Sequence, residues 1–178
     1  MVEVETTVKR NKWLEALFGK DYKGLKSGMA WSSLAARLLL GFVFLWGGLG
    51  KMAVWSTGKM ATAGFLTNVK PSVPLAGFFN GLSGNWTVEY LVVFGELLIG
   101  VSLILGLFTR VGCIAGIMQM ALFALAIWPS NPLIDMRILY GGFFLMLFFV
   151  APGRFLGVDG LFEKVLPEKL SKLKWMLG

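Results

Sequence analysis

The stretch at residues 90–108 most constrains what this chain can fold into, because it is an apolar run long enough to cross a lipid bilayer as a helix. Three further runs, at 33–52, 111–128 and 138–151, have a similar composition, and the last reaches full length with its flank from Leu133. The chain is 56% hydrophobic, and its charges lie mostly outside these runs. The sequence therefore predicts an all-α integral membrane protein, a bundle of four transmembrane helices in one domain.

Polar tails at 1–31 and 153–178 flank the predicted bundle at 32–152. Basic residues concentrate in both tails, and Arg110 lies in the tight turn between the second and third runs. Short cytoplasmic segments of membrane proteins are rich in Lys and Arg, so we expect a multi-pass protein of the cell membrane with both termini in the cytoplasm. The net charge of +7 then indicates topology and contact with anionic lipid, and no motif predicts nucleic-acid binding.

Two regions have more than one interpretation. Both tails contain amphipathic segments, which suit helices lying on the cytoplasmic membrane surface or docking with a partner's helix. The long first loop, at 53–86, contains Pro71, Pro74 and several glycines. It could cap a site at the outer face, or it could be a docking surface for a partner.

The residue inventory excludes several kinds of site. The chain has no His, so His-ligated haem, His-based metal sites and His-dependent nucleophilic catalysis are excluded. Its one cysteine, Cys113, cannot form an internal disulfide, and its small neighbours Gly112 and Gly116 favour a role in helix packing. No glycine-rich nucleotide loop is present, so no flavin site of that type is expected. Together with the lack of His, this means that no haem, metal or flavin site is predicted within the chain.

Glu96 lies near the middle of the second apolar run. A carboxylate at that depth costs about 2–3 kcal/mol to insert, so it should face the protein interior, where it either serves function or ties helices together by hydrogen bonding. Glu89 lies seven residues earlier on the same helix face, about 10 Å nearer the outer surface. Gly100, one turn deeper, predicts free space beneath Glu96.

The first run places a series of residues on one helix face, at successive spacings of four, three, four and three. The series is Arg37, Gly41, Phe44, Gly48 and Lys51. The glycines at its outer end allow another helix or a flat ligand to approach the backbone. Lys51 is either part of a site or a lysine that extends to the membrane interface.

Charged residues from three runs meet the same outer side if the topology is correct, because Asp135 and Arg137 open the fourth run there. These charges could form one outward-facing polar pocket, or they could be scattered anchors, with Arg37 and Arg110 in structural or ion-pairing roles elsewhere. The pocket would contain Lys51, Glu89, Glu96, Asp135 and Arg137, with Glu89 and Asp135 in structural or ion-pairing roles. The nearby Trp and Tyr residues also suit an ordinary aromatic belt at the membrane interface.

Two motifs resemble the DoxX and DoxD family of membrane proteins. The run ARLLLGFVFLWGGLGK at 36–51 is similar to the family's first helix, in which an Arg, a Gly-rich end and a Lys recur. The runs FGELLIG at 94–100 and LGLFTR at 105–110 are similar to its glutamate-bearing second helix and the turn that follows. The resemblance covers residues 33–158 approximately.

The resemblance to DoxD implies the membrane subunit of a thiosulfate:quinone oxidoreductase, which oxidises thiosulfate to tetrathionate and reduces a membrane quinone. It also implies a separate small DoxA-like subunit as partner. In this interpretation Glu96 is the catalytic proton donor or relay, and Lys51 and Arg137 bind the thiosulfate dianion. Trp46, Phe94 and Gly48 would bind the quinone ring.

A different class of function stays open. The absence of encoded redox ligands, the abundance of small packing residues and the amphipathic tails also suit a non-catalytic subunit of a terminal quinol oxidase or another respiratory complex. A solute carrier is a third interpretation, although the chain shows no internal repeat.

Overall fold

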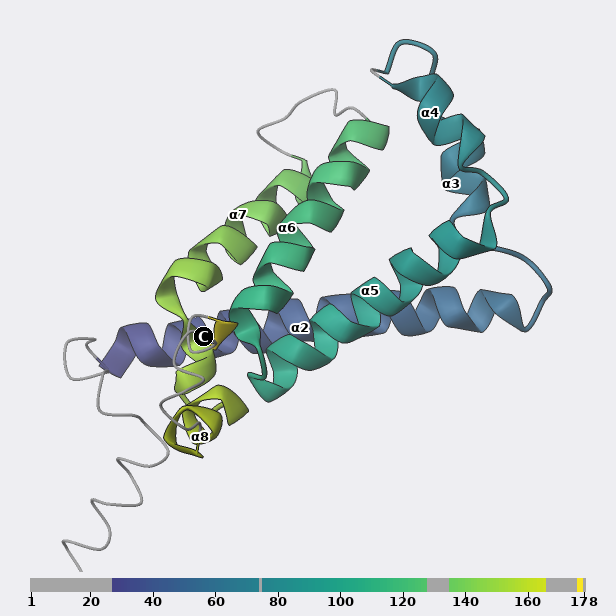
Figure 1. The fold of residues 1–178 in the computed structure, drawn as a ribbon. Coiled ribbons are helices and arrows are strands. Elements are labelled where there is room, and N and C mark those ends of the chain that lie inside the picture. The colour runs from purple at the N-terminus through teal and green to yellow at the C-terminus, as the bar shows by residue number, and fades with distance from the viewer. Residues whose placement is uncertain (1–26, 74, 128–134, 166–175, 178) are drawn as a thin grey trace, which may run out of the picture.

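A computed structural model describes residues 27–73, 75–127, 135–165, 176 and 177, and in this part of the chain every regular element is a helix (Figure 1). Several features predicted from the sequence lie outside the described residues, namely the basic clusters at 9–26 and 169–174 and the third loop at 128–134. The elements in chain order are α2 Ser27–Trp55, α3 Ala63–Thr67, α4 Ala76–Gly81, α5 Trp86–Leu105, α6 Thr109–Ala126, α7 Met136–Val150, η3 Pro152–Arg154 and α8 Val158–Val165.

Three of these helices, α2, α5 and α6, are long and apolar enough to cross a membrane. The fourth predicted span, α7, has 15 residues and is therefore about 22 Å long, shorter than the ~30 Å hydrocarbon core. The prediction of an all-helical, multi-pass membrane protein is confirmed. α2 begins six residues before the expected apolar run, since Ser27 to Ser32 continue the helix.

The ends of the helices have local causes. Asn85 caps α5 by accepting a hydrogen bond from the backbone N–H of Thr87 at 2.9 Å. Gly106 ends α5 in the left-handed conformation, with φ +64°, which a glycine adopts without strain. The turn at Gly106 reverses the chain, so α5 and α6 run antiparallel (Figure 1).

The helices α2 and α5 pack closely against each other, because glycines at their contact have no side chain to hold them apart. A Cβ at Gly41 would lie 2.9 Å from Ile104, and one at Gly48 would lie 2.8 Å from Leu97. The face predicted from Arg37 to Lys51 is therefore the face of α2 that packs inside the protein. Gly100 leaves no free space beneath Glu96, contrary to our expectation, because a Cβ there would lie 2.6 Å from the backbone of Leu45.

The central core lies where α2, α5, α6 and α7 meet. Its buried members are Leu40, Phe44, Ile99, Leu103, Cys113, Met120, Phe144 and Leu147. Gly116 of α6 lies directly against the Phe144 ring of α7, so these two helices also approach closely. Cys113 is fully buried here, as a packing residue would be.

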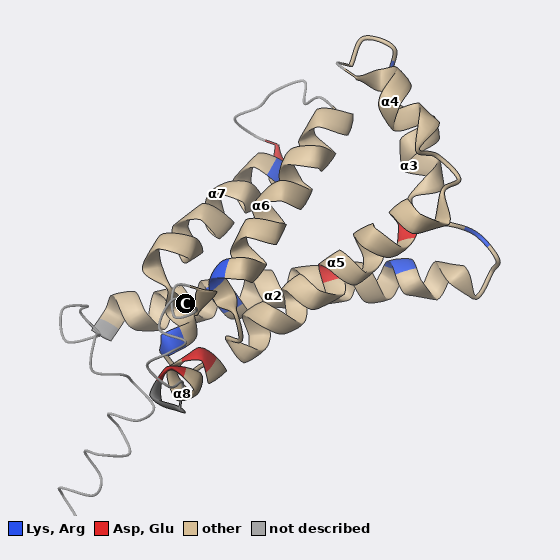
Figure 2. Ribbon diagram, in the orientation of Figure 1, with Lys and Arg blue, Asp and Glu red and all other residues tan. Residues whose placement is uncertain are grey.

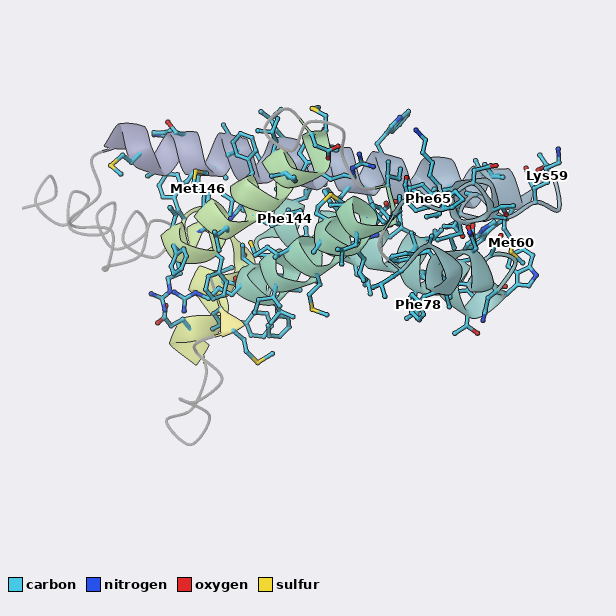
Figure 3. The ribbon with its side chains drawn as sticks, turned by 90° about the horizontal axis from the view of Figure 1, so that it is seen from above. Lys59, Met60, Phe65, Phe78, Phe144 and Met146 are labelled. Atoms are coloured by element: carbon cyan, nitrogen blue, oxygen red, sulfur yellow. The ribbon has the colours of Figure 1, made fainter. Side chains whose placement is uncertain are left out.

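The first loop folds back onto the end of the bundle where α5 begins and α6 ends, which we name the outer end after its predicted orientation. Leu66, Val69, Val73 and Phe79 of the loop form a second buried cluster with Ala126 at the end of α6. The Phe65 ring of α3 lies 5.6 Å from the Phe123 ring of α6, and Phe65 and Phe144 are labelled in Figure 3. These contacts pack the loop against the bundle, and its two interpretations, a cap over a site and a docking surface for a partner, both stay predictions.

Candidate functional site

An ion pair between Lys51 of α2 and Glu96 of α5 lies within the membrane-spanning part of the bundle. The Lys51 ammonium donates hydrogen bonds to both carboxylate oxygens of Glu96, at 2.8 and 2.6 Å. The Glu96 side chain is 6% exposed, whereas that of Lys51 is 29% exposed. Glu96 is the eleventh of the 20 residues in α5, so it lies about 15 Å from either end of the helix.

Contacts on either side of Glu96 show which way it faces. Its neighbour Gly95 meets Gln119 of α6, and its other neighbour Leu97 meets Gly48 of α2. Glu96 therefore projects between α2 and α6, into the interior. A Cβ at Gly47 would lie 3.4 Å from the Glu96 carboxylate. The residues that share this side of α5, namely Val93, Ile99 and Leu103, are all buried.

Aromatic rings lie below and above the level of this pair. On the inner side, the Phe44 ring lies 4.9 Å from Phe144 and 6.4 Å from Tyr140, edge to face in both cases. On the outer side, Phe65 packs on Phe123, one helical turn beyond Gln119. The pair is thus a polar site bounded by apolar rings.

Glu89 belongs to a different arrangement, although it shares a helix face with Glu96. Its carboxylate is fully buried and accepts hydrogen bonds from the Trp55 indole at 2.8 Å and from the backbone N–H groups of Ala61 and Thr62 at 2.8 and 2.9 Å. The Thr62 hydroxyl donates a fourth hydrogen bond at 2.5 Å. Glu89 thereby fixes the first loop to the outer ends of α2 and α5.

Asp135 and Arg137 pair with each other at the start of α7. The Asp135 carboxylate caps this helix by accepting from the backbone N–H of Arg137 at 2.9 Å, and the guanidinium donates to both of its oxygens, through Nε at 2.8 Å and through Nη2. The hydrogen bond from this guanidinium lowers the pKa of Asp135 to about 2.

The single outward-facing pocket that the sequence predicted is therefore not formed in the described part of the chain. Its five charges divide into the Lys51–Glu96 pair, the Glu89 cluster and the Asp135–Arg137 pair, and among the described residues no hydrogen bond or ion pair joins these groups. Figure 2 shows the charges at the start of α7 lying apart from those on α2 and α5. The physical reason is that each charge is satisfied by the nearest polar partner on its own segment or helix pair.

The residues predicted to bind a quinone ring also do not gather in one place. Trp46 is 79% exposed on the outside of α2, and Gly48 is filled by Leu97. Phe94 packs instead against the Trp55 ring, 6.1 Å away, on the outer flank of the α2–α5 contact. The described contacts therefore do not bring these three residues together, and their role in binding a quinone stays a prediction.

Arg37 and Arg110 lie at the end of the bundle opposite the first loop. Arg37 is 1% exposed, and its guanidinium donates to the backbone carbonyls of Pro152, Phe155 and Leu156, at 2.8, 3.3 and 3.2 Å. It thereby joins α2 to the segment that follows α7. The Arg110 guanidinium lies 5.8 Å from the centre of the Phe148 ring, so it contacts α7.

The similarity of the chain to a known protein family lies in the same helices. The DoxX family profile matches residues 32–128, which is more than half of the chain and includes most of α2 and all of α5 and α6. The chain belongs to the DoxX family. No curated protein and no solved structure shows significant similarity to it. Lys51, Glu89, Glu96 and Arg110 of this DoxX chain lie within the matched residues, whereas Asp135 and Arg137 lie outside them.

Three polar residues of the DoxX chain, namely Thr62, Asp159 and Gln119, escaped the sequence reasoning, and Trp55 was noted only as one of the aromatic residues near the charges. Thr62 and Trp55 both hold Glu89. Asp159, which is fully buried, accepts from the backbone N–H groups of Phe108 and Thr109 at 2.7 and 3.0 Å and so caps α6. Gln119 lies inside a predicted span, and an amide within an apolar run is the signal that could have identified it.

Proposed function

We propose that this chain is the membrane subunit of a thiosulfate:quinone oxidoreductase. The observation that carries the proposal is the Lys51–Glu96 pair, a carboxylate and an ammonium in contact at the middle of a membrane-spanning helix. Ionisable groups at that depth are costly and are often functional. The choice of thiosulfate as electron donor rests on the resemblance of the first two helices to the DoxD proteins.

The reaction requires two electrons and two protons. Two thiosulfate ions lose one electron each and join through a new sulfur–sulfur bond, which gives tetrathionate. The quinone takes up both electrons and two protons and becomes the quinol. In this proposal Glu96 delivers one of those protons, because it is the carboxyl group that projects into the bundle interior next to a cation.

The ion pair itself suggests how the two half-reactions are linked. In the described structure both proposed anion-binding residues have acidic partners, Lys51 with Glu96 and Arg137 with Asp135. Protonation of Glu96 would remove the negative charge beside Lys51 and leave its ammonium available to an anion. We therefore propose that a protonated Glu96 favours binding of the dianion by Lys51, with Arg137 nearer the outer surface.

Partners are part of the proposal. Electrons pass from thiosulfate to the quinone either directly or through a DoxA-like small subunit, and a terminal quinol oxidase would re-oxidise the quinol. The quinone is a substrate that arrives from the lipid bilayer. The first loop, which packs on the outer end of α6, is a candidate contact for the small subunit.

The test is thiosulfate-dependent reduction of a quinone analogue by the detergent-purified complex, with tetrathionate measured as product. We expect Lys51→Ala to lose most of the activity, whereas Trp46→Phe, on the lipid-facing side of the same helix, keeps it. If the folded wild-type complex, with its partners retained, shows no activity, the proposal fails and the non-catalytic respiratory subunit becomes the better account.

A further inference from the structure

Gln119 lies at the same depth as the Lys51–Glu96 pair. In the antiparallel helices α5 and α6, Ser102 meets Gly112 and Gly95 meets Gln119, so the two contacts are seven residues apart on each helix. This constant register places Gln119 level with the Gly95–Glu96 peptide. Gln119 thus brings a polar side chain from α6 to the depth of the pair, where it contacts the Gly95 side of α5.

The two ends of the Gln119 amide have different surroundings. Its Nε2 donates to the backbone carbonyl of Val92 at 3.2 Å. Its Oε1 is buried and accepts no hydrogen bond from any described residue, and it lies 3.7 Å from the position that a Cβ on Gly95 would take. Rotating the amide by half a turn would place two oxygens together at Val92, so the carbonyl end is the one presented to the interior.

A buried acceptor without a partner indicates that a donor is supplied from elsewhere. Thiosulfate cannot supply it, because the dianion only accepts hydrogen bonds. A quinone also only accepts, but the quinol formed from it has two hydroxyl groups that donate. Along α6, Gly116 meets the Phe144 ring and Phe123 lies four residues beyond Gln119, so apolar rings border the level of Gln119 on both sides.

We infer that Gln119 is a ligand-binding residue that recognises the reduced, quinol form of the substrate, its Oε1 accepting a hydrogen bond from a quinol hydroxyl. The inference rests on the proposed function in taking a quinone as the electron acceptor. It adds a residue and a redox preference to the site: Gln119 strengthens binding of the quinol and leaves binding of the quinone unchanged.

The experiment measures binding rather than turnover. The full chain, in lipid nanodiscs with its co-purifying partners, is titrated anaerobically with a short-chain quinol, with its dimethyl ether and with the quinone. Binding is followed by quenching of tryptophan fluorescence, for wild type, for Gln119→Leu and for Met118→Leu. Met118 is the matched control because it is adjacent on α6 and 61% exposed.

We expect Gln119→Leu to weaken quinol binding about tenfold, since one hydrogen bond is lost, and to leave the ether and the quinone unchanged. Met118→Leu should bind all three like wild type. Equal quinol binding by wild type and Gln119→Leu overturns the inference. If Gln119→Leu does not assemble, the comparison is made in the wild-type protein between the quinol and its dimethyl ether. Equally tight binding of the two overturns the inference, and weaker binding of the ether supports it.

The result also separates this inference from the proposed function. If quinol binding depends on Gln119 but the complex does not oxidise thiosulfate, the quinol site is supported and thiosulfate is rejected as the electron donor. Thiosulfate-dependent quinone reduction together with unchanged quinol binding in Gln119→Leu keeps the function and rejects the role of Gln119.

Discussion

Glu89 and Glu96 are two buried carboxylates on one face of α5, and their partners differ in kind. Glu89 accepts four hydrogen bonds, two of them from backbone N–H groups of the first loop, which do not move without the loop. Glu96 is held by Lys51 alone among the described residues, through a flexible side chain that is 29% exposed. Burial therefore does not distinguish the two carboxylates, but the nature of their donors does, and it is the basis for proposing a role in proton transfer for Glu96 alone.

The largest expected effect is on turnover in Glu96→Gln. If Glu96 transfers a proton, its amide cannot replace it, and quinone reduction should fall at least about a hundredfold. Assembly should be retained, because a glutamine still accepts a hydrogen bond from Lys51. The measurement is the rate per folded complex, with the folded fraction taken from size-exclusion chromatography. A rate within a factor of two of wild type would remove Glu96 from the chemistry.

Glu89→Gln should show the opposite pattern. The amide nitrogen would face N–H donors where a carboxylate oxygen now accepts, so the free energy of unfolding should fall by about 2–3 kcal/mol. The rate of the molecules that remain folded should stay near the wild-type value. Thermal unfolding in detergent, recorded together with the rate, tests both statements. A complex that is stable but inactive would place Glu89 in the mechanism and contradict the comparison.

The Lys51–Glu96 pair can be isolated by a double-mutant cycle. Lys51→Met and Glu96→Gln should each destabilise the fold, and together they should cost less than their sum, with a coupling energy of about 1–2 kcal/mol. Lys51→Met with Glu89→Gln is the matched cycle, and its two effects should add. Coupling of equal size in both cycles would show that the two carboxylates are not distinct.

Trp55→Phe tests one of the hydrogen bonds to Glu89 and leaves Glu96 unchanged. The ring remains but its N–H is lost, so one hydrogen bond to the carboxylate is removed, at a cost of about 1.5 kcal/mol. Trp46→Phe is the control because Trp46 is exposed. We expect the unfolding temperature to fall for Trp55→Phe and to stay unchanged for the control. An identical unfolding temperature for both would deny the contribution of this hydrogen bond.

The smallest expected effect is the loss of stability in Asp135→Asn. Asp135 is not part of the comparison between Glu89 and Glu96, and it shows how large the effect of a single ion pair near the surface is. Its pKa in the folded protein is lowered to about 2 by Arg137, so its charged form stabilises the fold above its ordinary pKa, near 4. That stabilisation should disappear as the pH falls from about 4 to 2. Asp135→Asn should lower stability by about 1 kcal/mol at pH 7 and by almost nothing at pH 2, as measured by unfolding across this range.

The sequence predicted the helices well because apolar runs of this length have few alternatives. The face from Arg37 to Lys51 was also predictable, since helical spacing alone brings Gly41, Gly48 and Lys51 to one side. Depth within the membrane marked Glu96 as unusual. None of these inferences required knowledge of how the helices pack.

The arrangement of the charges could not be predicted in the same way. The donors to Glu89 are backbone groups of Ala61 and Thr62, and spacing along α5 does not reveal where the loop returns. Gly100 was expected to leave space, but the approach of α2 fills it. Gln119 meets Gly95 only because α6 packs at that register. Partners that come from other segments depend on the fold as a whole.

The central claim is that Glu96, and not Glu89, exchanges a proton when the quinone is reduced. Infrared difference spectra between the quinone-loaded and quinol-loaded complex measure this directly, through the C=O band of a protonated carboxyl group. We predict a band that is present in wild type and in Glu89→Gln and absent in Glu96→Gln. A band that persists in Glu96→Gln, or that disappears only in Glu89→Gln, would contradict the account.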